Sequence, residues 1–87
     1  MGSYRLLVKK SIAKDLRAIP KRDLLRILKR IDGLTDDPRG PGTERLVGQN
    51  LYRTRQGDYR ILYEIQDTKR EVVVIKVAHR STAYDEP

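Results

Sequence analysis

The chain has 87 residues, and its 19 lysines and arginines outnumber its 12 acidic residues, for a net charge of +7. This length predicts one domain over residues 1–87. The absence of cysteine and the single histidine exclude a disulfide framework and argue against a protein-built metal site. Twelve of the 19 basic residues are arginine, whose guanidinium groups match phosphate geometry. The charge therefore favours nucleic acid or an acidic protein as partner.

No apolar run is long enough to span a membrane, and no apolar segment follows a basic start as in an export signal. The lack of cysteine also agrees with a reducing compartment. We therefore expect a cytoplasmic protein.

The first half of the chain predicts a strand followed by two helices. Tyr4–Lys9 is a short strand, and Ser11 is positioned to cap a helix that extends to Ile19. Pro20 ends this helix because it lacks an amide hydrogen and disfavours helical geometry in the preceding residue. A second helix is predicted over residues 21–34, where apolar side chains recur at helical spacing: Leu24, Ile27, Leu28, Ile31 and Leu34.

The second half predicts a long loop and three strands. Residues 35–48 are rich in Gly, Pro and Asp and are expected to form the loop, with Leu46 and Val47 attached to the core. After a hairpin and a polar turn at 66–70, residues 71–78 form a valine-rich inner strand, expected to be buried on both faces. The predicted fold is α+β in the order β-α-α-β-β-β, with a helical hairpin on one face of a small, curved, mainly antiparallel sheet. The first strand is expected beside the last, in either direction.

The hairpin at residues 51–65 concentrates arginines. Gly57 marks its turn, because glycine adopts positive φ at little cost. The loop could be the two residues 56–57 or the two residues 57–58, and either choice places Arg53, Arg55 and Arg60 on one face of the sheet. A three-residue loop would move Arg60 to the other face. Neighbouring like charges repel, so this face is either a solvated basic surface or a site for an anion.

The candidate functional side chains converge near the strand ends: Arg53, Arg55, Arg60, His79, Arg80 and Tyr84. His79 shares the face of Arg60 if the turn at 66–70 holds an even number of loop residues. Arginines would hold a phosphate, and a base could stack on Tyr84. Without a Gly-rich phosphate loop, a Ser-His-Asp order or paired carboxylates, the remaining chemistry is metal-free RNA cleavage by the ribose 2′-OH. The alternatives are that His79 caps a backbone group and Tyr84 holds the tail on the core.

Two segments resemble the RelE/ParE superfamily of type II toxin–antitoxin toxins: LYRTRQGDYRILYEI, and VAHRSTAY at the end of the last strand. The predicted order of elements also fits, and the resemblance is stronger to the RelE branch. It implies an endoribonuclease without cofactor or metal, which cleaves messenger RNA in the ribosomal A site and so inhibits translation. It also implies a hetero-oligomer with a cognate, acidic, RelB-like antitoxin, which suits the positive charge.

The resemblance implies roles for the hairpin arginines. Arg53 and Arg55 stand at basic positions of the family's second strand, and Arg60 matches its phosphate-binding arginine. The best-studied pattern has a lysine, proposed as the general base, where this chain has Arg55. Arginine hardly ever deprotonates, so either His79 takes a proton role or Arg55 acts only electrostatically.

The resemblance extends beyond the last strand. Arg80 matches an arginine proposed to stabilise or protonate the leaving group, Tyr84 matches a tyrosine that stacks on the substrate base, and His79 matches a histidine that several relatives carry. Two alternatives stay open: a ParE-like toxin that inhibits gyrase without nuclease activity, and a decayed toxin that only binds its antitoxin.

Overall fold

Five strands and three helices lie within residues 3–46, 48 and 50–83, which are the residues that this computed structural model describes. The elements are β1 (Arg5–Val8), α1 (Lys10–Arg17), α2 (Lys21–Asp36), β2 (Thr43–Arg45), β3 (Leu51–Gln56), β4 (Tyr59–Gln66), β5 (Glu71–His79) and α3 (Arg80–Ala83). None of the helices in this part of the chain is long and apolar enough to cross a membrane.

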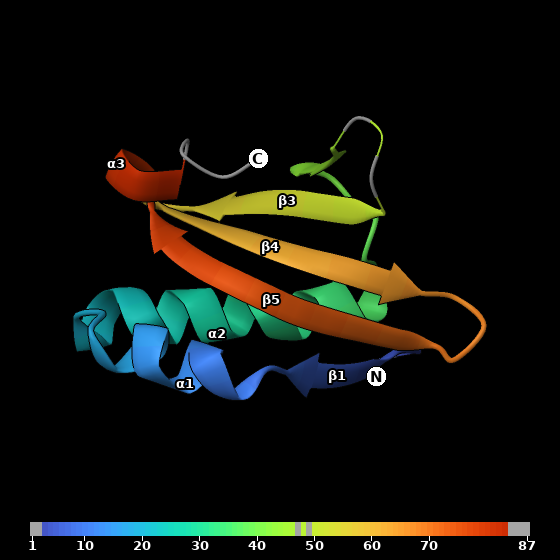
Figure 1. The fold of residues 1–87 in the computed structure, drawn as a ribbon, viewed down its shortest axis with the longest axis horizontal. Coiled ribbons are helices and arrows are strands. Elements are labelled where there is room, and N and C mark those ends of the chain that lie inside the picture. The colour runs from blue at the N-terminus through green and yellow to red at the C-terminus, as the bar shows by residue number, and fades with distance from the viewer. Residues whose placement is uncertain (1–2, 47, 49, 84–87) are drawn as a thin grey trace.

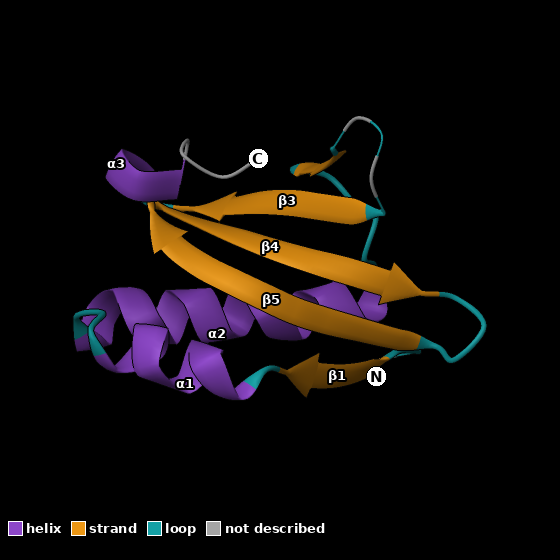
Figure 2. Ribbon diagram, viewed as in Figure 1, coloured by secondary structure: helices purple, strands orange, loops and turns teal. Residues whose placement is uncertain are grey.

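The strands form one sheet in the order β1-β5-β4-β3-β2, and the two long helices lie along it (Figures 1 and 2). The first strand pairs with β5 in parallel, which settles the direction that the sequence left open. All other neighbours are antiparallel. The predicted α+β class is therefore confirmed, with a short strand, β2, and a short helix, α3, added to the predicted elements.

The core lies between the helices and one face of the sheet. Ile12 of α1 and Ile27 of α2 are fully buried, and they face alternate residues of the central strands such as Ile61, Tyr63 and Val74. Alternation places every second side chain of a strand on the same face, so the intervening residues point away from the helices. Neither α1 nor α2 covers the opposite face of the sheet, which α3 borders at one end, and it is this face that is available to a ligand (Figure 1).

Two predictions about the first helix were wrong in detail: Ser11 does not cap it, and it ends at Arg17, with Ala18 as its C-cap residue, and not at Ile19. The first helix begins at Lys10 with Lys9 as its N-cap residue, so Ser11 lies inside the first turn and does not cap it. Pro20 is the N-cap residue of α2, and its carbonyl accepts a hydrogen bond of 2.9 Å from the Leu24 N–H. Proline suits this place because the first amides of a helix have no intrahelical acceptor.

The predicted loop at residues 35–48 contains β2, which the sequence analysis missed. A three-residue strand is too short for alternation to reveal. Polar contacts fasten the rest of the segment: the buried Tyr63 hydroxyl donates to the Pro38 carbonyl at 2.6 Å, and the Arg39 guanidinium bonds both carboxylate oxygens of Asp67. Leu46 is half-buried but is not among the side chains that pack against the core, and Val47 lies outside the described residues.

The last strand, β5, is an inner strand as predicted, but only one of its faces is fully buried. Val72 and Val74 are completely buried, whereas Val73 and Ile75 on the other face remain half-exposed. A β-bulge also interrupts its pairing with β4: Tyr63 pairs with Val74 and Leu62 pairs with Lys76, which leaves Ile75 as the extra residue. Each residue of β5 beyond the bulge therefore faces the side opposite to the one that simple counting gives.

Candidate nucleic-acid interface

The register of the central hairpin brings its arginines to the bare face. Arg55 pairs with Arg60, and the two-residue loop is Gly57-Asp58, with Gly57 at φ 59°. This is one of the two registers that the sequence allowed. Arg53 lies two residues along the same face of β3, opposite Leu62. The three hairpin arginines therefore share one surface, as predicted.

Arg80 joins this surface from the start of α3. Its backbone N–H donates to the Asp58 carbonyl at 2.7 Å, which ties the end of β5 to the hairpin turn. Its Nε lies 3.8 Å from the Asp58 carboxylate, and both side chains are largely exposed. A hollow of about 120 Å³ results, lined by Arg55, Gly57, Asp58, Tyr59, Arg60 and Arg80. We call this hollow the guanidinium site.

The arginines of this surface differ in how they are neutralised. Arg53 is held by Glu44 of β2, since its Nε donates to the Glu44 carboxylate at 3.1 Å and its Nη2 bonds the same oxygen. Within the described residues, no hydrogen bond or ion pair engages the side chains of Arg55 or Arg60. Arg53 therefore contributes little net charge, whereas Arg55 and Arg60 remain available to an anion.

Glu44 is a residue of this surface that sequence reasoning missed. The register pairs it with Arg53, so it lies on the arginine face. The hydrogen bonds from Arg53 lower the pKa of the Glu44 carboxyl, and the nearby charges of Arg55 and Arg60 lower it further. No local sequence signal could have found it, because Thr43–Arg45 becomes a strand only through its pairing with β3.

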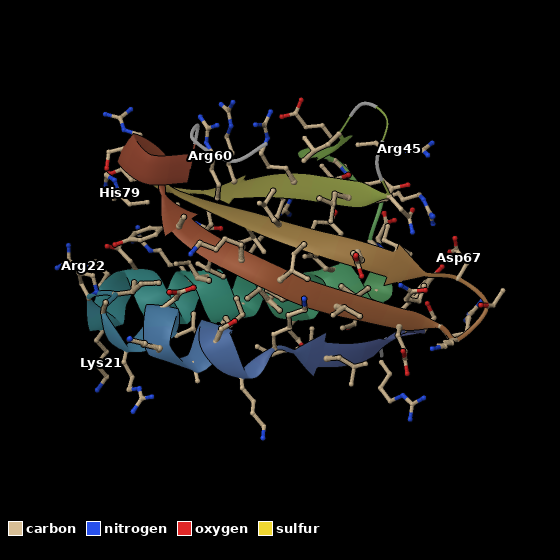
Figure 3. All side chains as sticks on the ribbon, in the orientation of Figure 1. Lys21, Arg22, Arg45, Arg60, Asp67 and His79 are labelled. Atoms are coloured by element: carbon tan, nitrogen blue, oxygen red, sulfur yellow. The ribbon has the colours of Figure 1, made fainter. Side chains whose placement is uncertain are left out.

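His79 lies on the helix-covered face, which contradicts its predicted place beside Arg60. The turn between the paired residues Gln66 and Glu71 holds an even number of residues, as the prediction required, but the bulge at Ile75 reverses the side on which His79 points. His79 pairs with Tyr59 and meets its ring edge-on, with the centroids 5.3 Å apart. Figure 3 shows His79 and Arg60 at the same end of the molecule.

The surroundings of His79 are structural. Its Nδ1 lies 2.9 Å from the Ser81 hydroxyl and accepts a hydrogen bond of 3.2 Å from the Ser81 N–H, so the ring caps the start of α3. It also borders a separate hollow of about 450 Å³ between α1 and the end of β5. The sequence alternative in which His79 caps a backbone group is the one that the geometry favours. Tyr84, the predicted stacking residue, lies outside the described residues.

The predicted toxin resemblance is supported by comparison with known proteins. The family model described as the ParE toxin of type II toxin–antitoxin systems matches residues 6–84. Toxin RelE of Mycobacterium tuberculosis is 30% identical over 83 residues, which cover 93% of this chain and 86% of the relative.

Solved structures give the same result. In the archaeal RelE–RelB complex from Pyrococcus horikoshii, the matching chain is 30% identical, with a TM-score of 0.81 over 90% of this chain and 96% of that one. In the toxin–antitoxin complex RelBE2 from M. tuberculosis it is 27% identical, with a TM-score of 0.79 over 90% and 99% of the two chains.

The fold, the arginine surface and these matches together define the class: the chain is a toxin of a type II toxin–antitoxin system and belongs to the RelE/ParE superfamily. Within that superfamily it is a RelE-like toxin, because its curated relatives and its structural neighbours carry that name.

Proposed function

We propose that this toxin is a metal-independent endoribonuclease that cleaves messenger RNA on the ribosome and thereby inhibits translation. One observation carries the proposal: Arg55, Arg60 and Arg80 surround a single hollow, and the only carboxylate among the described residues of its lining, Asp58, lies 3.8 Å from Arg80. Clustered guanidinium groups cost stability through mutual repulsion, so a bound phosphate would relieve the strain they impose.

The reaction needs only positioning, charge stabilisation and two proton transfers. The ribose 2′ oxygen attacks the adjacent phosphorus and loses its proton, the P–O5′ bond breaks, and the 5′ oxygen takes a proton from a solvent water. The products are a 2′,3′-cyclic phosphate and a 5′-hydroxyl end. Arg60 and Arg80 stabilise the extra negative charge of the phosphorane, which is the role that fixed donors fill best. Tyr84 keeps its predicted role of stacking on the substrate base.

Glu44 is the proton acceptor in this proposal. Arg55 hardly ever deprotonates, so it serves electrostatically, and His79 lies on the other face of the sheet. The lowered pKa of Glu44 keeps its carboxylate ionised at neutral pH but also makes it a weak base. A weak base in an open site gains most when another body orients the 2′-OH, which is why we assign that task to the ribosomal A site. This setting makes the toxin cytoplasmic.

An antitoxin is the proposed regulatory partner, because the matching chains in the RelE–RelB and RelBE2 structures are parts of toxin–antitoxin complexes. The edge strand β1 exposes Leu6, Leu7 and Val8, at 36%, 41% and 45% of their surface, beside a backbone edge that no other described strand pairs with. Apolar edges of this kind favour a protein that adds to the sheet. The net charge of +7 favours an acidic one.

The test is primer extension on messenger RNA after induction of the toxin in cells. We expect breaks inside translated codons for the wild-type chain and for Lys10→Ala, a charge removal on α1, and strongly reduced breaks for Arg60→Ala or Arg80→Ala. Glu44→Gln should retain the fold and lose most of the cleavage. Unbroken messenger RNA with induced DNA damage would instead support the gyrase-inhibiting alternative, and neither response would support a decayed toxin.

A further inference from the structure

A second basic hollow lies on the helix side of the sheet, at the open end of β3. It measures about 470 Å³ and is lined by Arg26, Lys29, Arg30, Gly33 and Gln56. Three of these five residues are cationic and none is acidic. Arg26 and Lys29 are exposed, and no hydrogen bond or ion pair engages their side chains within the part of the chain that the structure describes.

The cations of this hollow belong to one stripe of α2. Arg26 follows Arg22 by four residues, Lys29 and Arg30 follow Arg26 by three and four, and Gly33 follows them by four and three, so all five share one side of the helix. Asp32 follows Lys29 by three residues and Asp36 follows Gly33 by three, so acidic side chains border this stripe towards the end of the helix. Neither of them lines the hollow, and we define the basic ridge as Arg22, Arg26, Lys29 and Arg30.

Arg30 is fixed in place, which gives the hollow a rigid wall. Its Nε and Nη2 donate to the hydroxyl of the buried Thr54 at 3.0 and 2.7 Å, and Nη2 also donates to the Pro41 carbonyl at 2.9 Å. A Cβ on Gly42, which has a φ of 83°, would lie 2.8 Å from that Nη2. The guanidinium group is thus held before any ligand arrives, and binding need not pay for ordering it.

Gly33 is a second, independent observation. It lies inside α2, where glycine is unfavourable relative to alanine. A Cβ at this position would meet no atom within 4 Å and its φ is not positive, so neither packing nor backbone geometry calls for glycine here. Because Gly33 has no side chain, the hollow stays open between the cations.

Two consecutive residues of β3 connect this hollow with the guanidinium site. Strand β2 pairs only with residues 52–54 of β3, so the last two residues of β3 have no outer neighbour in the described part of the sheet. Arg55 points to the bare face and lines the guanidinium site, whereas Gln56 points to the helix face and lines this hollow. A polyanion can therefore pass around the edge of one strand from the first site to the second.

We infer that the basic ridge of α2 is a second phosphate-binding site, which holds the RNA backbone a few nucleotides away from the phosphate in the guanidinium site. This deepens the proposed function, on which it rests, by assigning the toxin a longer RNA footprint. RNA is favoured over an acidic protein because the lining is arginine, lysine, glutamine and glycine, with no apolar side chain to anchor a peptide.

The test measures binding and not cleavage, with uncleavable 2′-O-methyl RNA and the full chain free of antitoxin. Arg26→Ala combined with Lys29→Ala should weaken binding of a dodecanucleotide about tenfold and lower its log–log salt slope by about 1.4, the loss of two phosphate contacts. A trinucleotide, which reaches one site only, should bind the double variant as it binds the wild type. Lys10→Ala combined with Arg17→Ala removes the same charge from α1 and should leave the slope unchanged.

Gly33→Leu fills the hollow without changing charge and favours the helix, so it keeps the inference falsifiable if the double variant misfolds. It should weaken the dodecanucleotide and spare the trinucleotide. Wild-type affinity and slope in both variants would overturn the inference, as would a double variant that loses only antitoxin binding. The proposed function fails separately, if Arg60→Ala still cleaves messenger RNA on ribosomes.

Discussion

The two ends of the sheet both carry arginines but use them differently (Figure 3). At the end marked by Asp67, each arginine has a partner: Arg39 bonds Asp67 and Tyr52, Arg5 lies 3.1 Å from Glu71, and Arg70 lies over the ring of Tyr4. These contacts join the N-terminal strand, the loop after α2 and the turn before β5. Arginine here acts as a structural cross-link.

At the end marked by Arg60, the arginines of the guanidinium site lack close partners of this kind within the residues that the structure describes. Arg55 and Arg60 face each other across the hairpin, and Arg80 is only 3.8 Å from a single exposed carboxylate. The fold gains nothing from this arrangement, because neighbouring like charges repel. The comparison teaches that the pairing of an arginine, and not its presence, distinguishes a binding group from a structural one.

The largest effect should come from removing one arginine from each end and comparing the losses of activity and stability. Arg60→Ala should lower the rate of ribosome-dependent cleavage by about 10²–10³, the usual cost of one transition-state donor, with little change in the melting temperature. Arg39→Ala should do the reverse, with normal cleavage and reduced stability. Rates on programmed ribosomes and thermal melts of both variants check this. Equal losses of activity in the two variants would remove the distinction between the ends.

Tyr63→Phe tests the anchoring of the loop at the paired end. It leaves the buried Pro38 carbonyl without its donor, which should cost about 1–3 kcal/mol in the free energy of unfolding. Burial raises the pKa of Tyr63 to about 12 from an ordinary value of 10.0. Since the folded state holds this proton more tightly, the wild-type stability is complete below pH 10 and falls as the pH rises towards 12.

The phenylalanine variant should lack that alkaline loss. Urea titrations of both proteins across this pH range give the measurement. Parallel pH curves for the two proteins would show that another group, and not the Tyr63 hydroxyl, titrates with folding.

The sequence predicted well wherever periodicity is long. Ile27, Ile31 and Leu34 of the predicted stripe of α2 are buried, whereas Leu28 at the edge of the stripe is 43% exposed. The alternation of β3 and β4 places their side chains correctly, because a buried face tolerates only one register. The shared face of Arg53, Arg55 and Arg60 followed from that alternation alone. The RelE-like class followed from residues on the same hairpin and on the next strand.

The failures come from a one-residue bulge and from a three-residue strand. The bulge at Ile75 moved His79 to the other face, and no local pattern distinguishes such a bulge from a regular strand of valines and isoleucines. Strand β2 was missed because it exists only through its pairing with β3, and Glu44 was missed with it. In both cases, the deciding interaction is the pairing with another strand, which the residues of the segment itself do not encode.

Gly33→Ala tests whether packing requires the glycine that lines the second basic hollow. The added Cβ meets no neighbouring atom, so the gain in helix propensity should raise the free energy of unfolding by about 0.5–1 kcal/mol. Chemical denaturation of the variant beside the wild type measures it. A loss of stability would mean that packing requires glycine here, and the open hollow would then need no binding role.

The smallest effect concerns the pH dependence of the Arg39–Asp67 pair. The hydrogen bonds from Arg39 lower the pKa of Asp67 below its ordinary value of 3.8, with a further contribution from Tyr4. The pair therefore stabilises the fold above that value and loses its effect as the pH falls below it. Arg39→Ala should be slightly less stable than wild type near neutral pH, and the difference should shrink in acid and in high salt, because both groups are exposed.

Denaturation midpoints near neutral pH and at about pH 3, each at low and high salt, check this prediction. If the difference between Arg39→Ala and wild type stayed constant under all four conditions, the contribution of Arg39 would come from its packing on the Tyr52 ring, 5.4 Å away, and not from its charge. Arg39 would then still be a structural arginine, but one held by an aromatic face. Arg39 would then differ from Arg60 by the packing of its side chain on an aromatic ring, and not by its ion pair.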